Sequence, residues 1–321
     1  MAAAPDPLLI EQVNWAQYRP GQADGHYESF YQRANHPTRP LAFWIRYTIF
    51  SPHGRPADAV GELWAIVFDG ETGAHAVARR AHPIARCAFG RTGFDVRVAG
   101  STLGPGRLRG DAGAIAWDLA YTGDQPPVYL LPRAAYQPAA PNAKTLVGLP
   151  LARYDGTLAV DGRAIEVAGW LGSQNHNWGR QHAGHYAFGQ VAGFAGAPDS
   201  FLEVLTTRAH TLLVLRHAGR EHALAGAAGA GEFGYFHWAF RAGDAAVEVG
   251  GQLSAPPEAF VGLAYPDPPG GVRHCLNTKI GSCELTVTDR ATGRREVLRA
   301  PRRALFEIVT DDRAHGIEIR A

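Results

Sequence analysis

The chain has 321 residues, enough for one large hydrophobic core or two medium ones, and two is the expected number. Its 31 Lys and Arg residues balance 30 Asp and Glu residues, so the formal net charge of +1 gives no basis for nucleic acid or an anionic membrane as partner. No apolar run is long enough to span a membrane and the N-terminus lacks the pattern of a signal peptide, so we expect a cytoplasmic protein.

Short runs of β-branched and aromatic residues recur along the chain, separated by turns that contain Gly and Pro. Helical periodicity is hard to find, and the Ala-rich stretch 222–234 contains four glycines, which argue against a stable helix. We therefore predict an all-β protein built from barrels or sandwiches. The predicted strands span residues 41–50, 62–69, 94–100, 114–123, 211–217, 246–253 and 283–289, and the predicted hairpin turns lie at 69–73, 154–156, 160–162 and 289–293.

A Pro-rich passage at residues 122–144 separates two strand-rich blocks. It is either a linker or an irregular loop that lies over the mouth of a barrel. We predict two domains: residues 1–155, with the Pro-rich connection near its end, and residues 156–321.

Arg46 stands between Ile45 and Tyr47 in the first predicted strand. A guanidinium among apolar neighbours could anchor a carboxylate or an enolate. A solvated outer face of the strand explains the same pattern.

The stretch GSQNHNWGRQH, residues 172–182, places many donors and acceptors beside a large aromatic ring. In the functional interpretation His176 donates a proton or anchors a substrate, held by Asn175 or Gln174. In the alternative, the two Asn residues form Asx turns and His176 is an ordinary loop residue with satisfied hydrogen bonds. Trp178 could support a polyene or a carbocation through cation–π attraction, or it could simply belong to the core.

Two further predicted strands carry polar side chains among aromatic ones. In residues 185–194, Tyr186 and Gln190 share one face and His185 lies on the other. A buried amide such as that of Gln190 needs partners, so this face either meets a ligand or is exposed. In residues 234–241, Tyr235 and His237 lie opposite an aromatic stripe typical of core and could face a ligand chamber.

His176, His182 and His185 raise the possibility of a metal site, since three imidazoles suit zinc. The spacing is no established metal motif, however, and no Asp or Glu lies between them. We predict no metal and no cofactor.

The run GTLAVDGRAIEVAGWLGSQNHNWG, residues 156–179, resembles a segment of a lipocalin-like family. That family includes bacterial carotenoid hydratases and hydroxyneurosporene-synthase-type enzymes and, more distantly, plant tocopherol cyclases and lipocalin-like fungal Diels–Alderases. The resemblance implies two lipocalin-like (calycin) β-barrel or sandwich domains packed together, with an apolar ligand chamber. It also implies a role for Glu28, as the acidic residue before an aromatic cluster at the start of the first barrel. Asn175 departs from the pattern, which usually has Asp before the His.

These observations predict a cofactor-free enzyme that acts on an apolar isoprenoid or polyketide-type molecule in a β-barrel chamber, by hydration, dehydration, isomerisation or cyclisation. The alternatives are a carrier of a hydrophobic ligand and a metal-dependent hydrolase or lyase. The predicted catalytic residues are His176, Asn175 and Gln190. The predicted substrate-binding residues are Gln174, Trp178, His185, Tyr186, Tyr235, His237, Glu28 and Arg46.

Overall fold

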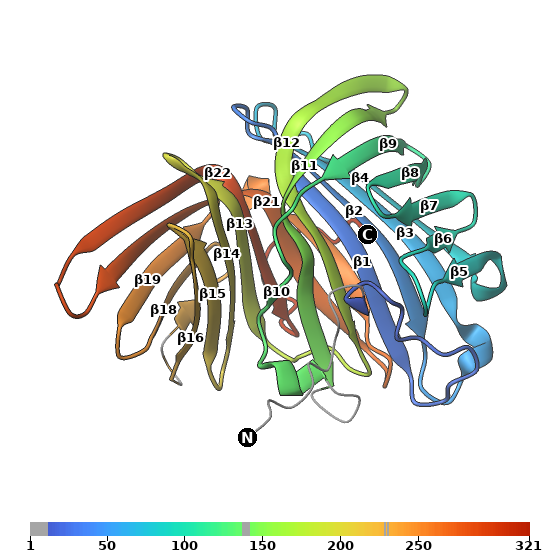
Figure 1. Cartoon of the computed structure of the whole chain (residues 1–321). Coiled ribbons are helices and arrows are strands. Elements are labelled where there is room, and N and C mark those ends of the chain that lie inside the picture. The colour runs from blue at the N-terminus through green and yellow to red at the C-terminus, as the bar shows by residue number, and fades with distance from the viewer. Residues whose placement is uncertain (1–11, 137–141, 228, 230) are drawn as a thin grey trace.

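The computed structural model describes residues 12–136, 142–227, 229 and 231–321. Its strands form two antiparallel sheets that lie side by side (Figure 1). In the described part of the chain the helical elements are four short 3₁₀ helices: η2 (Pro56–Asp58), η3 (Ile84–Arg86), η4 (Arg133–Tyr136) and η5 (Pro257–Ala259). The all-β prediction is confirmed. Among the same residues, no helix has the length and apolar character to cross a membrane.

The first sheet has 12 strands and forms a nearly closed barrel in which β4 and β5 are the end strands. Its order is β4-β3-β2-β1-β12-β11-β9-β8-β7-β6-β5, with β10 paired to β11. Its strands are β1 (His26–Asn35), β2 (Leu41–Ser51), β3 (Val60–Asp69), β4 (Ala76–Pro83), β5 (Cys87–Phe89), β6 (Val96–Val98), β7 (Ser101–Gly104), β8 (Arg107–Asp111), β9 (Ile115–Thr122), β10 (Val128–Tyr129), β11 (Ala143–Val160) and β12 (Arg163–Gly179).

The second sheet has 10 strands and closes on itself, because β16 also pairs with β18. The closed ring runs β16-β15-β14-β13-β22-β21-β19-β18, with β17 and β20 attached outside it. Its strands are β13 (Tyr186–Phe194), β14 (Ala197–Thr207), β15 (Thr211–His217), β16 (Arg220–Gly226), β17 (Gly231–Phe233), β18 (His237–Gly243), β19 (Val247–Ser254), β20 (Val261–Pro266), β21 (Val272–Asp289) and β22 (Arg295–Thr310). Two β-barrel units are therefore present.

One predicted hairpin turn, residues 154–156, is wrong. These residues lie inside β11, where the register with β12 shifts between Tyr154 and Gly156. Gly156 has φ +135°, and a Cβ on it would lie 2.2 Å from the carbonyl oxygen of Asp118. The glycine therefore permits a bulge within a long strand, and the turn itself comes at Asp161 and Gly162, with φ of 48° and 78°.

The segment that contains His176 lies in the first sheet. We had expected it in the second half, but β12 pairs with β1 and β11, and the second sheet begins only at Tyr186. The change from one sheet to the other thus falls between residues 179 and 186. The domain boundary at residue 155 stays a prediction, because membership of a sheet does not measure independent folding.

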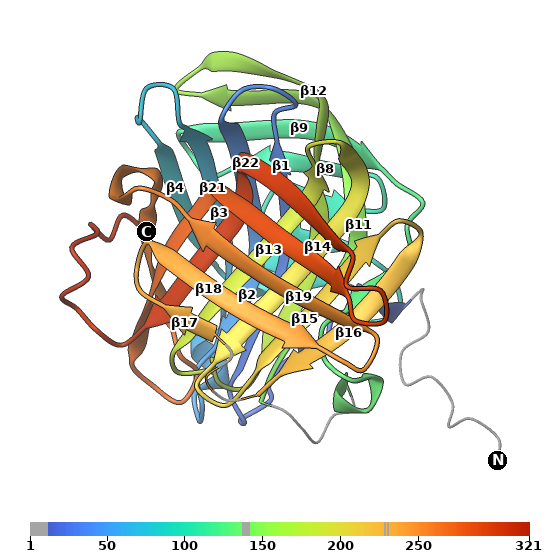
Figure 2. The same cartoon turned by 90° about the vertical axis from the view of Figure 1, so that its left-hand side faces the viewer.

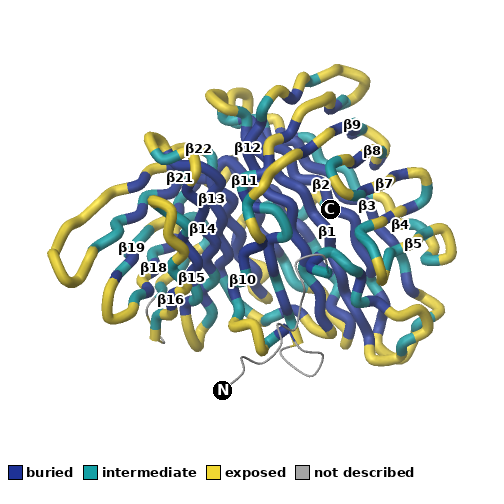
Figure 3. The backbone as a smooth tube through the Cα atoms, viewed as in Figure 1, coloured by how far each residue is buried: buried dark blue, intermediate teal, exposed yellow. Residues whose placement is uncertain are grey.

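Both barrels are filled with side chains. Phe30, Phe43 and Trp170 belong to the core of the first barrel. Trp238 and Phe306 stack inside the second. The buried residues are concentrated along the strands where the two sheets face each other, whereas the exposed ones gather at the hairpin tips (Figure 3). Turned by 90°, the second sheet lies in front of the first, so the sheets form two layers (Figure 2).

Candidate functional site

Strand β12 presents alternate side chains to two different surroundings. Ser173 and Asn175 bond to the second sheet, and Asn177 lines a cavity against it. Gln174 and His176 instead contact the N-terminal segment on the opposite face. The polar stretch therefore belongs to two clusters and does not form a single site.

His176 is fully buried, and both of its ring nitrogens are hydrogen-bonded. Nε2 lies 2.7 Å from Oε1 of Glu28, and Nδ1 lies 2.7 Å from the carbonyl oxygen of Val13. A carbonyl oxygen only accepts, so Nδ1 donates to Val13, while Nε2 faces the carboxylate of Glu28. The ring stacks on Phe30 with centroids 4.2 Å apart. These contacts tie the N-terminal segment to the first barrel, and His176 does not line the cavity.

Glu28 is the centre of this cluster. Its carboxylate also accepts hydrogen bonds of 2.8 Å from the backbone N–H groups of Gln17 and Tyr18, and one of 3.0 Å from His26. Burial alone would raise the pKa of Glu28, but hydrogen bonds from His176 and His26, with their charges, lower it to about 2. Glu28 is therefore ionised and fully engaged within the protein.

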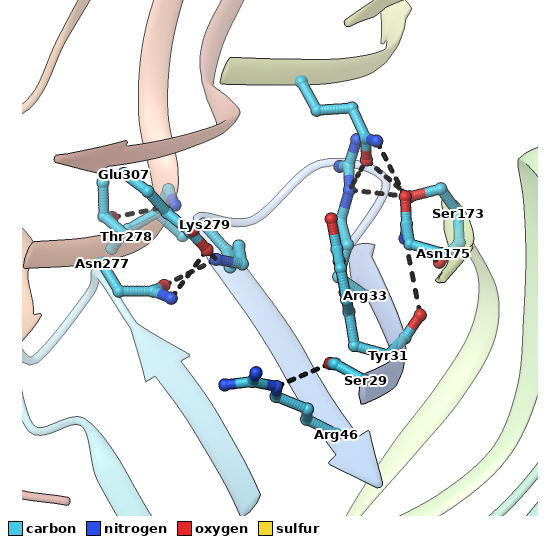
Figure 4. Close-up of polar contacts among 12 residues, drawn as sticks. Ser29, Tyr31, Arg33, Arg46, Ser173, Asn175, Asn277, Thr278, Lys279 and Glu307 are labelled. Atoms are coloured by element: carbon cyan, nitrogen blue, oxygen red, sulfur yellow. Dashed lines mark hydrogen bonds and ion pairs between the residues drawn. The ribbon is translucent and has the colours of Figure 1, made fainter. Parts of the chain in front are cut away.

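Asn175 and Gln190 meet in a buried polar network that joins the two sheets, and its members Arg33, Ser173 and Asn175 are labelled in Figure 4. The Gln190 amide donates to Oδ1 of Asn175 over 2.9 Å. Its oxygen accepts from Ser173 over 2.6 Å and from Nε of Arg33 over 2.9 Å. Arg33 also donates to Asn35 over 3.1 Å. Gln190 is therefore neither exposed nor part of the cavity lining, because its polar partners are protein groups.

Glu203 lies beside this network as the cross-strand neighbour of Gln190. It is fully buried, and neither of its carboxyl oxygens has a hydrogen-bond partner among the described residues. Burial raises the pKa of Glu203 to about 8, against the attraction of Arg33. The carboxyl group is therefore protonated in most molecules at neutral pH.

A cavity of about 110 Å³ lies between the two sheets. Strands β1, β2, β11 and β12 supply one wall, and β13, β14, β20 and β22 supply the other. The prediction places the ligand chamber inside a barrel, whereas the walls of this cavity come from both sheets. Ligand pockets are usually about 300–1,000 Å³, so this cavity fits a small molecule or one end of a larger one. Its aromatic lining consists of Tyr27, Tyr31, Trp44, Tyr186, Phe188 and Tyr265.

Three tyrosine hydroxyl groups of the lining have no hydrogen-bond partner among the described residues, those of Tyr27, Tyr31 and Tyr186. Burial raises the pKa of each phenol, that of Tyr31 and Tyr186 well above the ordinary value. They therefore keep their protons at neutral pH and can donate hydrogen bonds to a ligand.

His182 lines the cavity as a neutral imidazole. Burial, with Arg46 and Arg273 nearby, lowers the pKa of His182 to about 3. Its ring stacks on Tyr27 at 3.9 Å, and its backbone N–H donates to Asp267 over 2.9 Å. It is the imidazole that the structure places beside a ligand space.

Of the predicted substrate-binding residues, Arg46 and Tyr186 line the cavity. Three others do not. His185 packs against Phe233, and His237 is exposed. Tyr235 donates to Asp312.

Gln174 and Trp178 face the N-terminal segment. The amide of Gln174 exchanges two hydrogen bonds with that of Asn14, of 3.0 and 2.8 Å. Trp178 belongs to a small core with Val13 and Tyr136, which agrees with the core alternative.

His176, His182 and His185 have separate partners: Glu28, Tyr27 and Phe233. Within the residues that the structure describes, no three His, Cys, Asp or Glu side chains form a group that could hold a metal.

Sequence reasoning missed most of the aromatic lining. Tyr27, Ser29 and Tyr31 share one face of β1, and Trp44 and Arg46 share one face of β2. That alternation was visible, but both faces of these strands are buried, so polarity did not reveal which face met the cavity.

No family model matches the chain. Two uncharacterized proteins of Mycobacterium tuberculosis, MT0513 and Rv0493c, are each 26% identical to it over 294 residues, covering 86% of this chain and 87% of theirs. Solved structures share its fold. The crystal structure of a Nitrosomonas europaea protein assigned as AttH aligns with a TM-score of 0.58 at 16% identity. The alignment covers 92% of this chain and 98% of that one.

A second solved structure with this fold is CghA in complex with Sch210972, with a TM-score of 0.50 at 14% identity over 93% of this chain and 97% of that one. A further structure of CghA aligns with a TM-score of 0.51 at 13% identity, covering 95% of this chain and 98% of that one. The predicted lipocalin-like fold with two β-barrels is confirmed.

Proposed function

We propose that this protein is a cofactor-free enzyme that binds an apolar small molecule of isoprenoid or polyketide type between its two sheets. The reaction class is cyclisation, isomerisation, hydration or dehydration. The observation that carries the proposal is the cavity, where aromatic rings surround tyrosine hydroxyl groups that have no partner in the described protein. Apolar walls with a few convergent polar groups are typical of sites for small organic molecules.

The lining residues supply three kinds of assistance. Rigid aromatic walls hold a flexible substrate near one reactive conformer, which lowers the entropic part of the barrier. The hydroxyl groups of Tyr31 and Tyr186 donate hydrogen bonds to a substrate oxygen as negative charge develops there. His182, whose pKa is lowered to about 3, stays neutral at physiological pH and can accept a hydrogen bond from a substrate hydroxyl group.

The comparisons support this proposal through the fold alone. CghA, which shares the fold, has been solved with the small molecule Sch210972. The resemblance of residues 156–179 to lipocalin-like hydratases and Diels–Alderases favours the same reaction classes.

The proposal is tested with the short acyclic prenyl alcohols prenol and geraniol, which suit a cavity of about 110 Å³, by following product formation with gas chromatography and mass spectrometry. Tyr31→Phe and Tyr186→Phe should each lower turnover by about 10²-fold, the usual effect of removing one such donor. Tyr121→Phe is the matched control, because that hydroxyl donates to the carbonyl of Gly104 inside the first barrel. Binding without conversion would make the protein a carrier, and no binding would overturn the proposal.

A further inference from the structure

Arg46 is a buried cation that has no counter-ion among the described residues. Its side chain lines the cavity, and the residue is 9% exposed. The guanidinium carbon lies 4.7 Å from the ring centroid of Tyr265, 5.7 Å from that of Trp64 and 5.8 Å from that of Trp44. Contacts with aromatic rings offset only part of the cost of burying a charge. An anionic partner would therefore stabilise a guanidinium in this position.

The neighbouring carboxylates are already engaged. Glu62 accepts from Arg79 over 2.7 Å and from the indole of Trp64 over 3.1 Å. Glu307 accepts from Lys279 over 2.7 Å and from Asn277 over 2.8 Å. Among the described residues, no carboxylate lies within ion-pair distance of Arg46.

The guanidinium is nevertheless held in place. Its Nε donates to Oγ of Ser29 over 2.6 Å (Figure 4). The two terminal nitrogens have no hydrogen-bond partner among the described residues. A guanidinium fixed at Nε, with both terminal nitrogens open, matches the two oxygens of a carboxylate.

We infer that the ligand of this cavity carries a carboxylate and that Arg46 binds it through its two terminal nitrogens. The inference rests on the proposed function, because it names the head group of the molecule bound at that site. Trp44, whose indole N–H is buried without a partner among the described residues, lies on the same wall and is a second candidate donor. The tyrosine hydroxyl groups complete a lining rich in donors.

The volume of the cavity determines which small carboxylate can be used to test the inference. A cavity of about 150 Å³ accepts benzene. The space of about 110 Å³ is smaller but partly open, so it suits a carboxylate whose single ring or short chain extends toward the mouth of the cavity. Benzoate is such a ligand, and benzamide is its neutral counterpart of nearly the same shape.

The experiment measures the dissociation constants of benzoate and benzamide at pH 7.5 by isothermal titration calorimetry. The wild-type protein should bind benzoate at least 10-fold more tightly than benzamide, as expected for hydrogen bonds to a charged group. Arg46→Gln should abolish this preference while benzamide still binds. Arg46→Lys keeps the positive charge but loses the two parallel N–H donors of the guanidinium, so it should retain part of the preference for benzoate.

Arg97→Gln is the matched control. Arg97 is exposed, pairs with Asp95 over 2.9 Å and does not line the cavity. The substitution changes the net charge by the same amount and should leave the preference for benzoate unchanged.

Three results would count against the inference. Equal affinity of the wild-type protein for both probes would overturn the carboxylate assignment and leave the proposed function standing. An undiminished preference in Arg46→Gln would overturn the role of Arg46. Failure of both probes to bind would overturn both the inference and the proposed site.

Discussion

Adjacent residues of β12 have different tasks because their side chains leave the strand on opposite faces. His176 holds the N-terminal segment through Glu28 and Val13, while Asn177 borders the cavity. The proton-transfer role that the sequence indicated for His176 stays a prediction, and its contacts favour a structural role. A fully buried ion pair is costly to break, because the remaining partner keeps its charge without compensation.

His176→Ala should lower the free energy of unfolding by about 3 kcal/mol, the usual cost of removing one member of a buried pair. His237→Ala is the control, since that exposed side chain should change it by less than about 0.5 kcal/mol. Urea unfolding followed by tryptophan fluorescence measures both. A His176→Ala protein as stable as the wild type but unable to turn over substrate would return His176 to the catalytic residues.

Glu203 makes stability depend on pH in the opposite sense to Glu28. Its pKa is about 8 in the folded protein, so between the ordinary value near 4.5 and 8 the folded state binds more protons than the unfolded state. The free energy of unfolding should therefore fall as pH rises from 5 to 8, with a contribution of up to about 1.4 kcal/mol per pH unit.

Glu203→Gln should remove this contribution, and urea unfolding at intervals from pH 5 to 9 measures it. Parallel curves for the wild type and the variant would show that the buried carboxyl does not titrate in this range. Glu28 acts at lower pH, where its contribution is lost as the pH falls from about 4.5 to 2.

At the scale of elements, β11 is a long strand that bends at three bulges. The register with β12 shifts between Val147 and Leu149, between Pro150 and Ala152, and between Tyr154 and Gly156. Bulges of this kind increase local twist and let one strand follow a curved barrel. The hairpin of β11 and β12 thus extends beyond the rest of the first sheet (Figure 1).

Gly156→Ala should destabilise the protein by about 3 kcal/mol, because the new methyl group would collide with the carbonyl of Asp118 at a positive φ. Gly162→Ala tests the positive φ alone, since nothing lies within 4 Å of its added Cβ. That variant should lose about 1 kcal/mol. Thermal unfolding separates the two, and equal losses would show that the close approach at Gly156 relaxes without cost.

Local patterns predicted the strands well. The run 211–217 coincides with β15, and Asp161-Gly162 forms the expected tight turn. The turn expected at residues 154–156 was wrong because a glycine serves a bulge as readily as a turn. Sequence periodicity describes one strand at a time, so it could not show that β12 joins the first sheet.

The candidate site could be predicted only in part, for a reason that belongs to the whole molecule. Arg46 approaches Tyr265, and Asn35 donates to the carbonyl of Lys279 over 2.7 Å, contacts between distant parts of the chain. They arise from the docking of one barrel on the other, and no local pattern encodes that docking. The second sheet also holds the Pro-rich passage, since Arg216 donates to the carbonyl of Pro127 over 2.8 Å.

The position of the cavity has a consequence for how this protein can acquire new ligands. On β1, Phe30 supports the interior of the first barrel, while Ser29 and Tyr31 border the cavity from the other face of the same strand. Leu205 on β14 borders it from the second barrel. Mutational libraries confined to such outward positions can reshape the binding space while each barrel keeps its own core, so natural selection and directed evolution can vary specificity without rebuilding the scaffold.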